Sequence, residues 1–97
     1  MNVKIQAIHF EIADRLTEFA NKKAAKLERR FPEISSFEIT FTLIKPETAM
    51  NKEALVCIRQ PQQPEFVATK KADTFEEALD QAIEALEKPL EKAKARK

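Results

Sequence analysis

Lysine and arginine side chains recur between residues 14 and 31 with a spacing that gathers them on one side of a helix. At about 100° per residue, the cations on one flank of the apolar stripe are Arg15, Lys22, Lys23, Lys26, Arg29 and Arg30. The acidic residues Asp14, Glu18 and Glu28 lie on the other flank. Like charges in a row repel one another, and a line of phosphates is the commonest partner that compensates them. The pattern predicts a nucleic-acid contact, with a solvated helix flank as the alternative.

A second predicted helix, residues 73–96, shows the same separation of charge. Its acidic flank contains Glu77, Asp80, Glu84, Glu87 and Glu91, and its basic flank contains Lys88, Lys92 and Arg96. We expect the cations of the two helices to converge into one cationic surface after folding. The candidate RNA-binding residues are Lys22, Lys23, Lys26, Arg29, Arg30, Lys88 and Lys92.

Residues that could support catalysis or metal binding are few. His9 is the only histidine, and no nucleophile neighbours it in the sequence. Cys57 lies within an apolar strand pattern, which favours a packed thiol over a nucleophile. The chain has no glycine, so it lacks the loops that hold nucleotide phosphates. The sequence therefore predicts no enzyme, no cofactor, no metal site and no small-molecule substrate.

Length and composition favour one domain over residues 1–97. A chain of 97 residues can form one modest core. The formal net charge of +1 is an average over segregated patches, so it does not exclude a basic face. A single cysteine fits a reducing compartment. We find no apolar run of the length that a signal peptide or membrane span needs, and we expect a cytoplasmic protein.

Hydrophobic periodicity predicts six elements in the order β-α-β-β-β-α. The strands are residues 3–10, 37–44, 53–59 and 65–71, and the helices are residues 14–31 and 73–96. One apolar sheet face and two amphipathic helices predict an α+β two-layer sandwich, in which both helices cover one face of a four-stranded sheet. The last three strands should form an antiparallel meander, and the first should pair in parallel with a neighbour.

Local signals refine this expectation. Asp73 and Glu76 fit a capping box at the start of the second helix, whereas Ala13 or Asp14 offers the first helix only a weak cap. Pro89 removes a helical hydrogen bond, so we expect a kink or an early end near Lys88 and fraying from about residue 89. The phenylalanines expected in the core are Phe19, Phe31, Phe37, Phe41 and Phe75.

Three segments resemble the ribosome hibernation factors, a family that includes the hibernation promoting factor and the ribosome-associated inhibitor once called sigma-54 modulation protein. The first helix ends in a segment similar to K-x-x-K-L-E-[KR]-x-F, which reads Lys23-Ala24-Ala25-Lys26-Leu27-Glu28-Arg29-Arg30-Phe31 here. Residues 73–90 look like D-x-M-Y-A-A-I-D-x-A-x-D-K-L-E-R-Q-L. The spacing from Ile5 to Glu11 and Ile12 is similar as well.

The resemblance implies a partner and a mode of action. It implies binding to ribosomal RNA in the channel of the small ribosomal subunit, where messenger and transfer RNA would lie, with translation stopped as a result. Lys23, Lys26, Arg29 and Lys88 match basic or polar positions of the motifs, whereas Lys22, Arg30 and Lys92 come from helix geometry alone. No oligomer is required.

Several departures from the family pattern change what we expect. Ala85 and Pro89 replace the lysine and glutamine of K-L-E-R-Q-L, and Glu76 and Glu77 make the start of the second helix more acidic. We therefore expect the second helix to contribute less RNA affinity than is typical. The chain also resembles the short form of the family, without a C-terminal domain.

Two alternative functions remain open at this point. A double-stranded-RNA-binding domain has a similar α-β-β-β-α order, although its loops use glycine and this chain has none. A protein-interaction module, including a transcription regulator, would use the charged flanks for a protein partner.

Overall fold

The fold has the element order β-α-β-β-β-α that periodicity predicts. A computed structural model of the chain describes residues 1–45 and 49–95. Its elements are β1 (Asn2–Ile8), α1 (Asp14–Arg30), β2 (Ser36–Leu43), β3 (Lys52–Arg59), β4 (Phe66–Ala72) and α2 (Phe75–Ala95). The predicted boundaries differ from these by at most two residues, and Arg96 lies outside the described residues.

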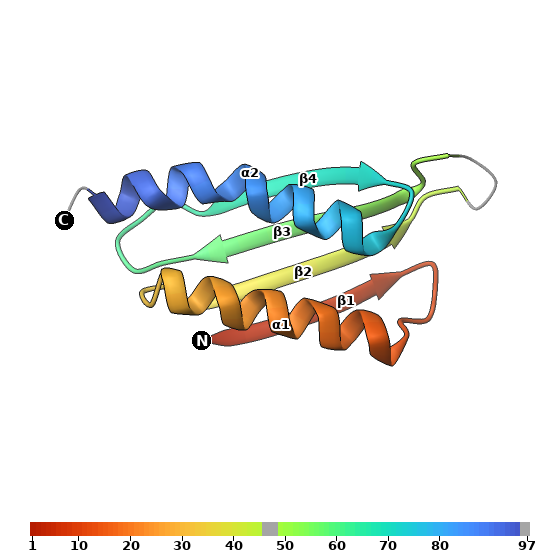
Figure 1. Ribbon diagram of the computed structural model, residues 1–97, viewed down its shortest axis with the longest axis horizontal. Coiled ribbons are helices and arrows are strands. Elements are labelled where there is room, and N and C mark those ends of the chain that lie inside the picture. Colours follow the sequence, from red (N-terminus) through yellow and green to blue (C-terminus); the bar gives the residue numbers. More distant parts are fainter. Residues whose placement is uncertain (46–48, 96–97) are drawn as a thin grey trace.

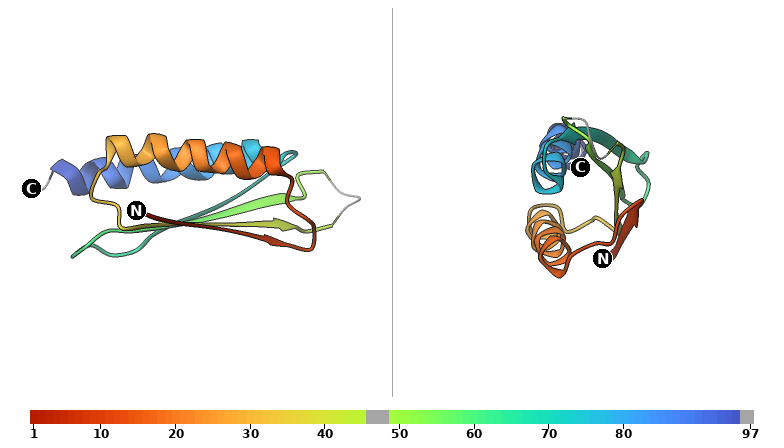
Figure 2. Two further views of the ribbon diagram at one scale, coloured as in Figure 1. Left: turned by 90° about the horizontal axis from the view of Figure 1, so that it is seen from below. Right: turned by 90° about the vertical axis from the view of Figure 1, so that its right-hand side faces the viewer.

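The four strands form one mixed sheet in the order β1-β2-β3-β4. β1 pairs in parallel with β2, so Val3 lies opposite Phe37. β2, β3 and β4 form the expected antiparallel meander. Figures 1 and 2 show both helices on the same face of this sheet, which confirms the predicted two-layer architecture.

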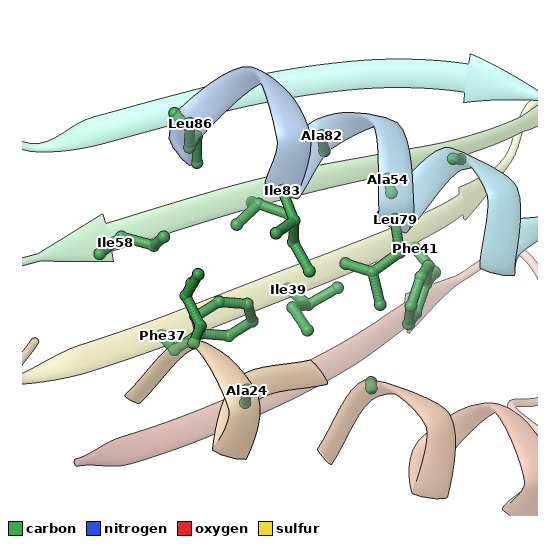
Figure 3. Packing of buried hydrophobic residues seen from close by; sticks show 14 of the residues in the cluster. Ala24, Phe37, Ile39, Phe41, Ala54, Ile58, Leu79, Ala82, Ile83 and Leu86 are labelled. Atoms are coloured by element: carbon green, nitrogen blue, oxygen red, sulfur yellow. The ribbon is translucent and has the colours of Figure 1, made fainter. Parts of the chain in front are cut away.

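The core lies between the sheet and the helices. Alternation along β2 directs Phe37, Ile39 and Phe41 toward the helices, and all three are fully buried. The facing residues of β3 and the helices complete the layer seen in Figure 3; they include Ala54, Val56, Ile58, Ala24, Leu79 and Leu86. This continuous apolar layer fixes both helices on the sheet.

The two helices run in parallel beside each other (Figure 1). The topology explains this direction, because β1 and β4 point the same way and each is followed by a helix that returns along the sheet. When two parallel helices lie side by side on one surface, the clockwise flank of one faces the anticlockwise flank of the other. The basic flank of α1 therefore faces the acidic flank of α2.

The caps of the helices differ from each other. Ala13 precedes α1 and makes no side-chain capping bond, as its side chain predicts. At α2 the predicted cap was wrong by one residue, because the backbone N–H of Glu77 donates to Thr74 Oγ1 at 3.1 Å. Asp73 has another role: its Oδ1 accepts the backbone N–H of Met50 at 2.8 Å. Asp73 thus holds the loop before β3 against the start of α2.

The expected end of α2 near Lys88 is also wrong, because the helix continues through Pro89 to Ala95. Tertiary contacts explain the difference. Leu90 is fully buried and Ala93 nearly so, which gives the turns after Pro89 a place in the core. Lys94 Nζ also donates to the backbone carbonyl of Arg30 at 3.0 Å and joins the ends of the two helices.

Three residues within 1–45 and 49–95 have a positive φ. They are His9 (68°), which follows β1, Met50 (53°), which lies two residues before β3, and Gln62 (63°), which lies between β3 and β4. In the turn between β3 and β4, the N–H of Gln63 donates to the carbonyl of Gln60 at 3.3 Å. Gln62 therefore occupies the third position of a turn in which glycine is the usual residue.

The face of the sheet opposite the helices is mainly polar. Glu38, Thr40 and Thr42 are half-buried there, as their alternation predicts. Arg59 contacts two carboxylates of this face, Glu65 at 2.9 Å and Glu38 at 3.5 Å. Neither helix of the described chain is long and apolar enough to cross a membrane.

Candidate nucleic-acid interface

A groove of about 750 Å³ separates the exposed sides of α1 and α2. Its α1 wall is basic and contains Lys23, Lys26, Arg29 and Arg30. Its α2 wall is acidic and contains Asp80, Glu84 and Glu87, while Leu27 and Ile83 complete the lining. Four of the seven candidate RNA-binding residues therefore line one groove, beside carboxylates that share it.

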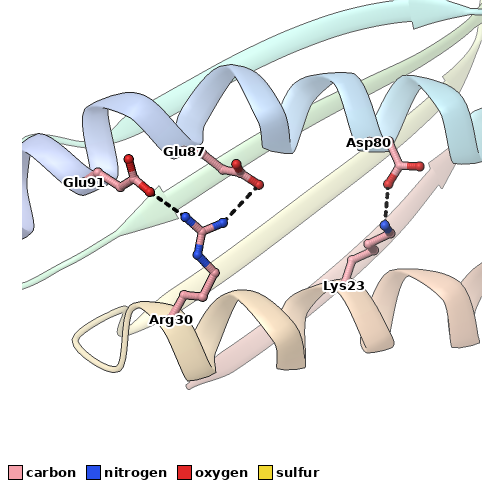
Figure 4. Close-up of polar contacts among 5 residues, drawn as sticks. All are labelled: Lys23, Arg30, Asp80, Glu87 and Glu91. Atoms are coloured by element: carbon pink, nitrogen blue, oxygen red, sulfur yellow. Dashed lines mark hydrogen bonds and ion pairs between the residues drawn. The ribbon is translucent and has the colours of Figure 1, made fainter.

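Ion pairs cross this groove at two levels (Figure 4). Lys23 Nζ lies 2.7 Å from Asp80 Oδ1. At the last residue of α1, the guanidinium of Arg30 contacts Glu87 at 3.3 Å and Glu91 at 2.5 Å. The expected single cationic surface is therefore wrong, because the basic flank of α1 faces the acidic flank of α2.

Four cations of α1 take no part in the ion pairs of the described residues: Arg15 in the first turn, and Lys22, Lys26 and Arg29 farther along the helix. Lys22, Lys26 and Arg29 are exposed, and within residues 1–45 and 49–95 no carboxylate pairs with them. All three line a hollow of about 380 Å³ along the exposed side of α1. We call these three residues the α1 basic row. Lys26 and Arg29 also line the groove between the helices, so the row extends from the rim of that groove along the exposed side of α1.

Phe19 lies beneath the α1 basic row and is the one predicted core phenylalanine that is not buried. It packs only partly against the core and lines the same hollow as the row. The ammonium of Lys23 stands 5.2 Å from the centroid of its ring. An aromatic face next to cations can contribute attraction to a bound cation or contact a sugar, so Phe19 belongs to the site although its period placed it in the core.

Lys88 and Lys92 do not join the α1 cations. Both are exposed, and neither lines the groove between the helices. A rotation of about 100° per residue turns Lys88 away from Glu87, which faces α1. Lys92 follows one turn later on the same side. These two residues therefore form a separate basic group on the far flank of α2.

The ion pairs across the groove are exposed enough to be exchanged. The side chains of Lys23 and Asp80 are 31% and 49% exposed, and those of Arg30 and Glu87 are 46% and 38% exposed. Pairs of this kind stabilise a protein by about 0–1 kcal/mol. An external anion can thus replace the carboxylates of α2 at little cost to the fold.

The residues considered for catalysis lie elsewhere. Burial and a hydrogen bond to Glu65 raise the pKa of the Cys57 thiol from 9.0 to about 11, which keeps the thiol protonated. Cys57 belongs to the outer face of the sheet, and His9 lies beyond the end of β1. Among the described residues, no group of histidine, cysteine and carboxylate side chains could hold a metal ion.

Comparison with known proteins adds to this picture of an α+β domain with a basic helix flank. The chain belongs to the sigma 54 modulation protein / S30EA ribosomal protein family, whose model matches residues 3–97. This is the family that the sequence motifs indicate, and it consists of ribosome-associated factors and not of enzymes. The predicted membership in a family of ribosome-associated factors is confirmed. A search of curated proteins gives no significant match.

Solved structures show the same fold. A ribosomal subunit interface protein from Coxiella burnetii is 24% identical, with a TM-score of 0.84 over 98% of this chain and 99% of that one. The N-terminal domain of Thermus thermophilus Protein Y is 20% identical, with a TM-score of 0.78 over 95% of this chain and 98% of that one. At these identities the comparison supports the architecture and not the individual contacts.

Proposed function

We propose that this protein binds the small ribosomal subunit, contacts its ribosomal RNA through the basic side of α1, and blocks translation by occupying the channel of messenger and transfer RNA. The observation that carries this proposal is the α1 basic row, three exposed cations without carboxylate partners in the described chain. Membership in a ribosome-associated family supplies the partner. Ribosome binding would place the protein in the cytoplasm.

The spacing of the row suits a phosphate backbone. Lys22 and Arg29 are seven positions apart, which corresponds to about 10 Å along a helix axis. One strand of a duplex advances about 3.4 Å per phosphate, so three cations span about three phosphates. Lys23 and Arg30 stand at the inner edge of the row and can add two contacts when they leave their carboxylates.

The proposed recognition reads the RNA backbone and not its bases. Proteins that read single strands through a sheet stack bases on aromatic residues of its open face. Here the open face carries Glu38, Thr40 and Thr42 in the central strand. Inhibition would then follow from steric exclusion, since a domain docked in the channel leaves no room for messenger or transfer RNA.

The second basic group has a smaller proposed role. Lys88 and Lys92 lie on the far flank of α2, where they can contact RNA only if it wraps around that helix. Ala85 and Pro89 offer no charge beside them. We therefore assign the main contact to Lys22, Lys23, Lys26, Arg29 and Arg30, with Lys88 and Lys92 as outlying contacts.

Sedimentation with purified ribosomal subunits tests the proposal. The protein should sediment with isolated small subunits and not with large ones, and messenger plus transfer RNA should displace it. Reversing the α1 basic row (Lys22→Glu, Lys26→Glu, Arg29→Glu) should abolish binding. Equal binding to both subunits, or retention in the presence of messenger and transfer RNA, would contradict the proposed location.

The same assay addresses the alternative functions. Tighter binding to a plain RNA duplex than to small subunits would indicate a double-stranded-RNA-binding domain instead. If the protein does not bind ribosomes, and it keeps a protein partner in an extract treated with nuclease, the result would indicate a protein-interaction module.

A further inference from the structure

The acidic wall of the groove raises a question that the proposed function leaves open, because a surface for RNA should repel phosphates as little as possible. The carboxylates Asp80, Glu87 and Glu91 are the ones that hold α1 cations. Glu84 lines the same wall without a cation partner among the described residues. Four acidic side chains thus stand next to the proposed contact.

We propose that Asp80, Glu87 and Glu91 are specificity-determining residues that occupy Lys23 and Arg30 in the free protein and compete with RNA phosphates for them. The inference rests on the proposed function and concerns its regulation. Each carboxylate is an internal substitute for a phosphate. RNA must displace it before the cation can contribute to binding.

The geometry of Arg30 supports this competition. Its guanidinium contacts carboxylates from two residues one turn apart on α2, so both of its terminal nitrogens have a carboxylate partner. All three side chains are at least 38% exposed, so the guanidinium can turn outward if it also gives up its contact with the ring of Phe31, whose centroid lies 5.1 Å from Cζ. Arg30 then reaches the same side as Arg29, its neighbour in the α1 basic row.

Lys23 is held in a comparable way. Its ammonium lies 2.7 Å from Asp80 and near the ring of Phe19. A four-carbon stem allows the ammonium to swing between α2 and the outer hollow, which Lys23 also lines. The competition therefore acts on both cations at the inner edge of the row.

Selectivity follows from this arrangement. A single phosphate gains little by displacing a carboxylate of equal charge at short range. Several phosphates held close together by a folded RNA displace several carboxylates at once, because their combined field is stronger. The acidic wall thus weakens binding to sparse or flexible polyanions more than binding to compact ribosomal RNA.

The outer face of the sheet supplies a matched control. Arg59 also contacts two carboxylates, Glu38 and Glu65, at similar exposure. Glu38→Gln with Glu65→Gln removes the same charge as Glu87→Gln with Glu91→Gln, but on the opposite face of the molecule. The two double variants separate the local effect of the groove from the change in net charge.

Affinity for small ribosomal subunits, measured at one salt concentration, tests the inference. Asp80→Asn should tighten binding about 2- to 5-fold, and Glu87→Gln with Glu91→Gln should tighten it about 5-fold. Each change removes carboxylates that compete with RNA phosphates, and the exposed ion pairs that it breaks are weak. The control variant should change affinity less than about 2-fold. In an Arg30→Gln background, the Glu87 and Glu91 substitutions should have no more effect than the control.

The outcomes separate the two proposals. Parent protein that fails to bind small subunits would overturn the proposed function. The inference alone would be overturned if the parent protein binds small subunits but Asp80→Asn and the Glu87→Gln, Glu91→Gln variant bind no more tightly than the control variant, or bind more weakly than the parent. Thermal unfolding of each variant checks that the helices still pack, and a shift in affinity that persists in the Arg30→Gln background would also contradict the competition.

Discussion

The salt dependence of ribosome binding provides the sharpest test of the α1 basic row. The perturbation is Lys22→Gln with Lys26→Gln, which removes two exposed cations that have no carboxylate partner in the described chain. Both side chains extend from a helix whose buried face stays unchanged. The substitution should therefore alter the electrostatics of binding and leave the fold intact.

The expected magnitude follows from counterion release. Five α1 cations on five phosphates give a slope of log K against log salt of about −4.5, at about 0.9 per phosphate of a duplex. A fourfold rise in salt then weakens binding about 500-fold. Loss of two contacts reduces the slope to about −2.7, so the same rise weakens binding only about 40-fold.

Equilibrium binding to small subunits over a salt series measures both slopes. Lys4→Gln with Lys71→Gln is the matched control, because both lysines lie on the exposed face of the sheet and the net charge changes equally. The control should keep the slope of the parent. A slope that is unchanged in the α1 variant, or reduced equally in the control, would refute the assignment of the contact to α1.

Three further predictions concern stability and reactivity. Gln62→Gly should raise the free energy of unfolding by about 0.5–1 kcal/mol in a urea titration, because glycine removes the penalty of a left-handed backbone. The control Gln63→Gly, at a position without positive φ, should lower the free energy of unfolding in the same titration. Pro89→Ala should stabilise α2 by up to about 3 kcal/mol, since it restores a backbone hydrogen bond inside a helix, and a loss of stability on urea unfolding would contradict this. With the pKa of Cys57 raised from 9.0 to about 11, its alkylation at pH 8 should be about 100-fold slower than in the unfolded chain. Because the unfolded thiol ionises first, the free energy of unfolding should also fall between pH 9 and 11, and Cys57→Ala should remove that part of the decline.

Periodicity was sufficient for the fold because β2, β3 and both helices each have one clear apolar face. The alternation of Phe37, Ile39 and Phe41 identifies β2 and its buried side, and the order of strands and helices leaves few ways to cover that side. The end of α2 could not be predicted in this way. Local chemistry at Pro89 opposes a helix, and only the burial of Leu90 and Ala93 in the folded core overcomes it.

The sequence indicates the candidate residues one by one, but it does not describe the surface that they form. The charge sorting of each helix is present in the sequence, including the acidic residues Asp80 and Glu87. What was missing was the step from topology to contact: parallel helices bring flanks of opposite sense together. Applied to the predicted strand order, this rule would have placed the lysines of α1 against the carboxylates of α2, because β1 and β4 point the same way.

The parallel helices also give the molecule an electrical direction along its length of 46 Å. Both helices begin at one end with acidic first turns, at Asp14 and at Glu76 and Glu77, and both finish at the other end with basic last turns. Full side-chain charges outweigh the opposing half-charges of the helix termini. Under the proposed function, the field of a polyanion would exert a torque on this moment and turn the basic ends of both helices toward the RNA before contact.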